Sequence, residues 1–146
     1  MSRSGYHDDC SGSQEEQWAT IRWRGAVKSA VRGKRGQAFI RRALKALDAM
    51  GTAELASHTF EADGKYCLLG AVAKHEGIDL TEINEDYDEE WGDDGEGAEN
   101  LAVDLNIAQA MAREIVWEND ECYVGSDNRR FEYMRGWLIA NLDGDL

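Results

Sequence analysis

Three parts of this chain carry residue types that are suited to chemistry: a cysteine thiol, a run of acidic residues and a segment with the pattern of a DNA-reading helix. Cys67 opens an apolar segment just after the pair Asp63-Gly64. A thiol at a helix N-terminus becomes a nucleophile when a histidine acts as its base. His75 lies eight residues on, about 12 Å along a helix, which is too far for a direct hydrogen bond, and His58 approaches only through the fold. We therefore expect a buried structural cysteine, no catalytic residue, no enzyme and no cofactor.

Alternating acids at Asp86, Asp88 and Glu90 have the spacing of oxygen ligands in a calcium-binding loop. Such a loop needs glycine at its sixth position and glutamate at its twelfth, where this chain has Trp91 and Gly97. The spacing of cysteine and histidine gives no zinc signature. We therefore expect a solvated acidic loop and no metal site.

Residues 101–117 begin with the pattern Leu-Ala-x-x-Leu-x-Ile, which is similar to the helix-turn-helix of many phage regulators. In that arrangement Asn106 occupies the turn, and the second helix presents Gln109, Arg113 and Glu114 to a groove of DNA. Contacts with phosphates supply most of the affinity of a protein for DNA. Arg113 is the only basic side chain of this segment, and it lies in the more acidic half of the chain. The interpretation that we prefer is one continuous amphipathic helix.

The segment of residues 22–45 carries nine basic side chains and no acidic one. Trp18, Trp23 and Phe39 are interleaved with these cations, a combination typical of nucleic-acid contacts. The alternative is intramolecular: this basic segment neutralises the acidic stretch 82–99. The candidate residues for either contact are Arg22, Arg24, Lys28, Arg32, Lys34 and Arg35.

Residues 82–99 carry ten carboxylates and no basic side chain. Carboxylates spaced on a rigid surface imitate phosphates, so they suit a nucleic-acid-binding cleft on another protein. The alternative is that they only keep the protein in solution. The residues predicted to contact a partner are Glu85, Asp86, Asp88, Glu89, Glu90, Asp93 and Asp94.

The elements that must position these residues are predicted to be helices. Residues 67–73 are apolar all round and predict the most buried helix, ending at Gly77, while two glycines in 32–37 predict a basic loop. Four further stripes have helical spacing: Ala19, Trp23, Ala26, Val27, Ala30; Phe39, Ala43, Ala46, Leu47, Met50; Leu101, Leu105, Ala108, Ala112, Ile115; and Phe131, Met134, Leu138, Leu142.

The predicted fold is mainly α, a compact single-domain helical bundle of about five helices with an acidic loop and little room for a sheet. A chain of 146 residues fits one domain. Residues 1–17, rich in Ser, Gly and acids, predict a flexible N-terminal arm, and residues 18–146 the helical domain. We expect Gly51 to cap the second helix, Asp63-Gly64 to form a tight turn and Asn100 to begin a helix.

Charge and cysteine usage bear on compartment and partners. The net charge is −13, and residues 46–146 hold six basic and twenty-five acidic side chains, a net −19. Such a body repels nucleic acid and acidic lipids and favours basic partners. Three widely spaced cysteines predict reduced thiols in a cytoplasm. No apolar run approaches the roughly 20 residues of a membrane span, so no membrane contact is expected.

Two resemblances follow from longer runs. The run from Arg22 to Met50, the opening Met-Ser-Arg-Ser-Gly-Tyr, and the later Ala-Arg-Glu-Ile and Glu-Asn-Asp resemble small uncharacterised proteins of bacteriophages and prophages, over nearly the whole chain. This resemblance implies a viral origin and no known activity. Tyr66-Cys-Leu-Leu-Gly-Ala71 with Trp117-Glu-Asn-Asp120 is similar to a small helical actinobacterial family of unknown function, in the C-terminal half only.

We therefore expect a phage-encoded accessory protein in the cytoplasm of a host bacterium. It would bind a host protein through its acidic surface, as an inhibitor of host defence or a mimic of nucleic acid. The alternative is a small nucleic-acid-binding regulator that uses residues 22–45 or the helix-turn-helix-like segment 101–117. The oligomeric state has no signature in the sequence.

Overall fold

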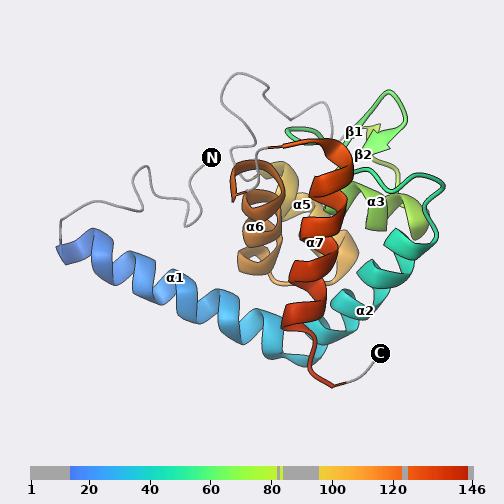
Figure 1. The fold of residues 1–146 in the computed structure, drawn as a ribbon. Helices are drawn as coiled ribbons and strands as arrows, with labels where there is room; N and C mark the ends of the chain where they lie inside the picture. The colour runs from blue at the N-terminus through green and yellow to red at the C-terminus, as the bar shows by residue number, and fades with distance from the viewer. Residues whose placement is uncertain (1–13, 82, 84–95, 123–124, 145–146) are drawn as a thin grey trace.

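Helices make up most of the computed structural model, which describes residues 14–81, 83, 96–122 and 125–144 (Figure 1). The predicted mainly-α bundle is confirmed, and within the described residues the only sheet is a two-stranded hairpin. The elements are α1 (Gln14–Arg32), α2 (Lys34–Asp48), β1 (Glu61–Ala62), β2 (Lys65–Tyr66), α3 (Leu68–His75), α5 (Glu96–Leu105), α6 (Gln109–Trp117), the π-helical turn η1 (Glu118–Cys122) and α7 (Asp127–Asn141).

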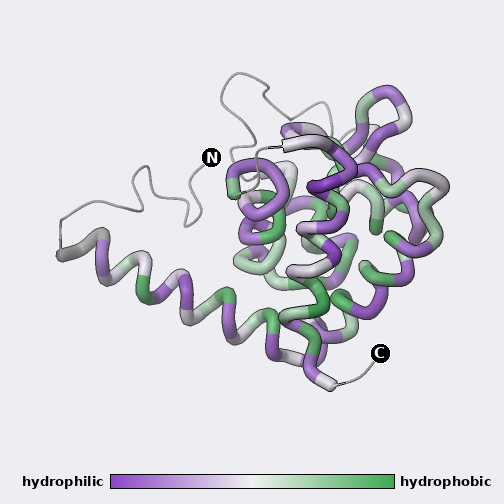
Figure 2. The backbone as a smooth tube through the Cα atoms, viewed as in Figure 1, coloured by the Kyte–Doolittle hydropathy of each residue, from purple (hydrophilic) through white to green (hydrophobic). Residues whose placement is uncertain are grey.

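Helix α6 lies at the centre of the bundle and packs against α1, α3 and α5, while α2 packs against α3 and α7. One continuous hydrophobic core joins these helices, and Phe39, Phe60, Leu69, Met111 and Ile115 are fully buried in it. Figure 2 shows hydrophilic and hydrophobic residues alternating along α1. This alternation is typical of a helix that covers the core with one face only.

The basic loop predicted at residues 32–37 is wrong, because only Gly33 separates α1 from α2 and residues 34–37 form the first turn of α2. The second glycine serves close packing instead of a loop. A Cβ atom on Gly36 would lie 2.0 Å from the carbonyl oxygen of Ala30, so only glycine lets α2 approach the end of α1 this closely. The predicted cap at Gly51 is also wrong, since α2 ends at Asp48 and is capped by Ala49.

Helix starts differ from the prediction in two places. Helix α1 begins at Gln14, so residues 14–17 belong to it and not to the predicted arm. Helix α5 begins at Glu96, so residues 96–99 are helical instead of part of an acidic loop, and Asn100 lies inside that helix. Buried Ala98 explains the earlier start, because it extends the apolar stripe of α5 by one turn.

The segment 101–117 is two helices, so the interpretation as one continuous helix is wrong. Asn106 has a φ of 56° and ends α5 in the left-handed conformation that asparagine tolerates. The N–H groups of Asn106 and Ile107 donate to the carbonyls of Val103 and Ala102, which is the hydrogen-bond pattern of a Schellman cap. The apolar stripe of residues 101–117 nevertheless continues on both sides of this break. It does so because Ile107, the residue after Asn106, is buried in the core.

Two local turn predictions are confirmed. Asp63 and Gly64 both have positive φ, 52° and 76°, as a two-residue type I′ hairpin requires, and they join β1 to β2. Gly77, with a φ of 77°, ends α3 in a second Schellman cap.

None of the helices in the described part of the chain combines the length and apolar character that crossing a bilayer requires.

Candidate functional site

The predicted acidic contact residues Glu85, Asp86, Asp88, Glu89, Glu90, Asp93 and Asp94 lie outside the described residues, as does most of the candidate calcium-loop segment. The chain on both sides of them is anchored. Leu80 and Ala98 are buried members of the hydrophobic core, and Ile83 packs against that core. The acidic segment is therefore attached to the folded domain at both of its ends.

The six predicted basic residues are all exposed. None of their side chains makes an ion pair with another described residue, whereas Arg42, Arg113, Arg130 and Arg135 each pair with a carboxylate. Helix α1 carries Arg22, Arg24, Lys28 and Arg32, and the first turn of α2 carries Lys34 and Arg35.

Two large apolar side chains are exposed beside these cations. Trp18 and Ile21 are 55% and 57% exposed, and they lie on the side of α1 opposite to its buried residues Ala19 and Val31. Figure 1 shows that the N-terminal part of α1 extends away from the other helices. This face of α1 is therefore both cationic and apolar.

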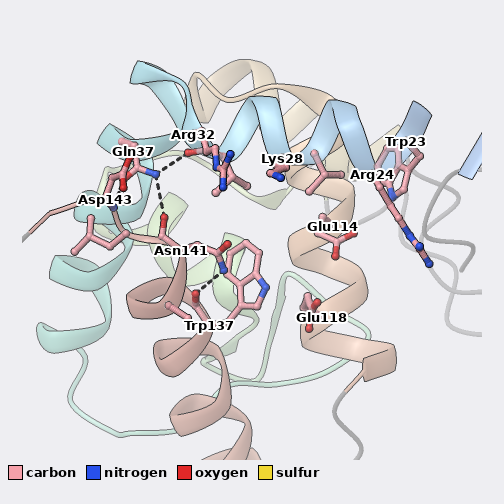
Figure 3. A pocket seen from close by; sticks show the side chains of 14 residues that line it. Trp23, Arg24, Lys28, Arg32, Gln37, Glu114, Glu118, Trp137, Asn141 and Asp143 are labelled. Carbon is pink, nitrogen blue, oxygen red and sulfur yellow. Dashed lines mark hydrogen bonds between the residues drawn. The ribbon is translucent and has the colours of Figure 1, made fainter. Parts of the chain in front are cut away.

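Sequence reasoning missed a groove between α1, the α6–η1 segment and α7 (Figure 3). Its volume is about 430 Å³. Helix α1 lines one wall with Trp23, Arg24, Lys28 and Arg32, and the facing walls carry Glu114, Glu118 and Trp137. A cationic wall thus faces two carboxylates, with an indole ring on each side.

Both groove carboxylates belong to buried residues: Glu114 is 3% exposed and Glu118 is 7% exposed. Tyr133 donates its hydroxyl to Oε2 of Glu118 at 2.6 Å, and the Sγ atom of Cys122 lies 3.0 Å from the same hydroxyl. Burial, followed by the hydrogen bonds to Cys122 and Glu118, raises the pKa of Tyr133 well above its ordinary value. The neutral phenol is therefore kept as a hydrogen-bond donor to Glu118.

The two ends of the groove differ in how their polar groups are satisfied. At one end Gln37 donates to the carbonyls of Val31 and Asn141, at 2.8 and 3.0 Å, and accepts from the N–H of Asp143 (Figure 3). At the other end the indole Nε1 of Trp23 is buried and has no hydrogen-bond partner among the described residues. A buried donor left in this state costs stability.

A second polar cluster, also missed, is structural. Asn119 donates to the carbonyl of Ala56 at 2.9 Å and accepts from the N–H of Leu68 at 3.2 Å. Arg130, also buried, donates to the carbonyls of Asn119 and Leu55 at 2.9 and 3.1 Å. These bonds fasten the chain before α3 to η1 and α7, which is a structural role.

Cys67 is buried, as predicted. Its side chain accepts a hydrogen bond from the N–H of Gly70 at 3.4 Å and caps the N-terminus of α3. His58, the histidine that could approach this thiol through the fold, has its Nε2 atom 3.7 Å from a carboxylate oxygen of Glu121. The thiol thus sits at a helix N-terminus but is enclosed by the core.

The helix pair α5–α6 has a turn at Asn106, as the helix-turn-helix alternative requires. Of the three predicted reading residues only Gln109 is exposed, because Glu114 is buried and Arg113 pairs with Glu99. Helix α6 is the central helix of the bundle. Two of the three predicted reading residues, Arg113 and Glu114, are therefore not exposed on α6.

One sequence signal marks the groove carboxylates. Glu114 and Glu118 stand three and seven residues after buried Met111, so they continue the helical spacing of the apolar stripe from α6 into η1. Acids at such positions are rarely buried without a specific role.

No group of three or more potential metal ligands occurs among the described residues. Comparison with protein-family models, curated proteins and solved structures finds no match for this chain.

Proposed function

We propose that this chain is a phage-encoded accessory protein that acts in the host cytoplasm without catalysis, by binding a host protein through its acidic segment. The partner is expected to have a basic cleft of the kind that binds nucleic acid. The observation that carries the proposal is the concentration of ten carboxylates at residues 82–99, a segment that follows buried Leu80 and contains buried Ala98 near its end.

Electrostatics explains why such a segment suits this role. Like charges at this density repel one another and cost stability, so a segment that serves only the fold gains nothing from them. A partner with a basic cleft is attracted over roughly one Debye length, about 8–10 Å. Attachment of the segment at both ends reduces the ordering entropy that binding must overcome.

The test compares two triple variants with the same change of charge. The first replaces Asp86, Asp88 and Glu90 with Asn or Gln. The control replaces Asp63, Asp104 and Glu132, three exposed acids elsewhere on the domain. Each protein is immobilised, host proteins are retained from lysate, and the binding of the retained protein is measured at rising salt.

We expect a partner that the wild type and the control variant retain, that the first variant releases, and whose association rate falls as salt rises. Equal retention by all three proteins at every salt concentration contradicts the proposal. The acidic segment would then be a solubility device. Circular dichroism checks that all variants keep the helical signal.

A second candidate function, nucleic-acid binding, is favoured by the exposed cations of α1 and α2, which make no ion pair with other described residues. The exposed ring of Trp18 is available for stacking on a base. Retention on DNA- or RNA-cellulose at low salt, lost in Arg22→Gln/Arg35→Gln but kept in Lys74→Gln/Arg129→Gln, supports this candidate. Equal loss in both variants indicates nonspecific attraction.

A further inference from the structure

We propose that the groove between α1, α6–η1 and α7 is a binding site for a mononucleotide whose base carries an exocyclic amino group. The phosphate would bind along the α1 wall at Lys28 and Arg32, the base would stack on Trp137, and the amino group would donate to Glu114 or Glu118. This inference is independent of the acidic segment and of the protein partner proposed above.

The opposed charges of the walls limit the ligand class. A simple anion is attracted by Lys28 and Arg32 but repelled by the buried carboxylates of Glu114 and Glu118 that face them. A simple cation meets the reverse problem. A ligand with a negative group at one end and hydrogen-bond donors at the other satisfies both walls, because each end then meets its complement.

The cationic wall is suited to phosphate. Arg24, Lys28 and Arg32 are spaced four residues apart, so successive cations rise about 6 Å along the same side of α1. All three are exposed and make no ion pair with another described residue. Guanidinium and ammonium groups in this state bind phosphate oxygens by charge-assisted hydrogen bonds.

The rest of the groove is suited to a planar base. Trp23 and Trp137 line it from α1 and α7, and its volume of about 430 Å³ lies within the range of small-molecule sites. Aromatic side chains stack on bases irrespective of sequence. The carboxylates accept hydrogen bonds from an exocyclic amine.

The experiment uses the full chain and follows tryptophan fluorescence together with isothermal titration calorimetry. The probes are AMP, IMP, adenosine and spermidine. IMP has a carbonyl where AMP has an amino group, and adenosine lacks the phosphate, so each comparison isolates one end of the ligand. We expect AMP to bind about tenfold more tightly than IMP or adenosine, since each lacks one charge-assisted contact.

Two variants assign the contacts. Lys28→Gln/Arg32→Gln removes exposed cations of the groove, and Lys34→Gln/Arg35→Gln removes the same charge just outside it. The first should weaken AMP about tenfold and leave adenosine unchanged, whereas the control should leave AMP within about twofold. Glu114→Gln, which keeps the volume of the side chain, should reduce the preference for AMP over IMP.

Three outcomes overturn the proposal. One is the absence of saturable AMP binding at millimolar concentration. Another is binding of spermidine but not of AMP, which would assign the groove to cationic ligands. The third is equal weakening of AMP in both double variants, which would show general attraction to the basic surface. If Glu114→Gln loses the helical signal, that variant is unfolded and its affinities are not used. The two cation variants, which change exposed residues, then decide whether AMP binds in the groove.

Discussion

A Cβ atom on Gly70 would lie 1.9 Å from the carbonyl oxygen of Phe60, so helix α3 rests directly on the backbone of the segment before the hairpin. This contact places Phe60 fully inside the core. A side chain at position 70 must therefore push the two backbones apart.

Gly70→Ala is expected to lower the free energy of unfolding by about 1–3 kcal/mol, because the backbone of Phe60 is unable to yield as a flexible side chain would. Gly136→Ala is the control: it lies inside α7, and its added methyl group would meet nothing within 4 Å. That variant should gain about 0.5–1 kcal/mol from helix propensity. Urea unfolding followed by circular dichroism measures both, and equal stabilities would contradict the packing argument.

Asn119→Ala tests the buried polar cluster. The change leaves the carbonyl of Ala56 and the N–H of Leu68 without the partner that the amide supplies. Each buried group left unsatisfied costs about 1–3 kcal/mol, so we expect a clear fall in the urea midpoint. Asn128→Ala, at an exposed position of α7, should change stability by less than about 0.5 kcal/mol. A similar small effect at Asn119 would show that the cluster contributes nothing to stability.

The two described cysteines should differ in reactivity. Cys122 is exposed and Cys67 is buried, so a thiol reagent should label Cys122 in the native protein and Cys67 only when the fold opens. The measurement is the rate of labelling in a Cys10→Ser background, with peptides identified by mass spectrometry. Labelling of Cys67 in the native state as fast as that of Cys122 would refute its assignment as a buried structural residue.

Alkaline pH should weaken the wild type through Tyr133. Burial and the hydrogen bonds to Cys122 and Glu118 raise the pKa of this phenol in the folded state. Its contribution to stability is complete below the pKa of an unfolded tyrosine, near 10, and is lost as the pH rises toward the folded value, because only the unfolded chain then releases the proton. Urea unfolding of wild type and Tyr133→Phe should therefore show a stability difference that moves in favour of Tyr133→Phe above about pH 10. A difference that stays constant with pH would contradict this account.

Local signals in the sequence predicted the elements that local chemistry controls. The stripe of Phe39, Ala43 and Leu47 identified the buried face of α2 because apolar spacing follows the helical period wherever one face is covered. The Asp63-Gly64 turn was predictable for a similar reason, since its positive φ angles are available to those two residue types without contacts from elsewhere.

The break at Asn106 shows where a local pattern misleads. The apolar stripe of residues 101–117 continues in register across the turn, so periodicity alone favours one helix. The left-handed Asn106 and the two bonds of its cap end α5 instead. One continuous helix and two helices separated at Asn106 are the competing arrangements. The burial of Ile107 in the core decides between them.

The sequence by itself determined the helical class, the hairpin turn, the burial of Cys67 and the separation of charge along the chain, because each depends on neighbouring residue types. Only the tertiary structure decided the roles of Gly36 and Gly70, whose missing side chains admit another backbone, and the burial of Glu114 and Glu118. It also created the groove, since Lys28 and Trp137 come together only when α1 and α7 pack around α6–η1. Packing between segments distant in sequence sets such distances, and no local pattern of residues encodes them.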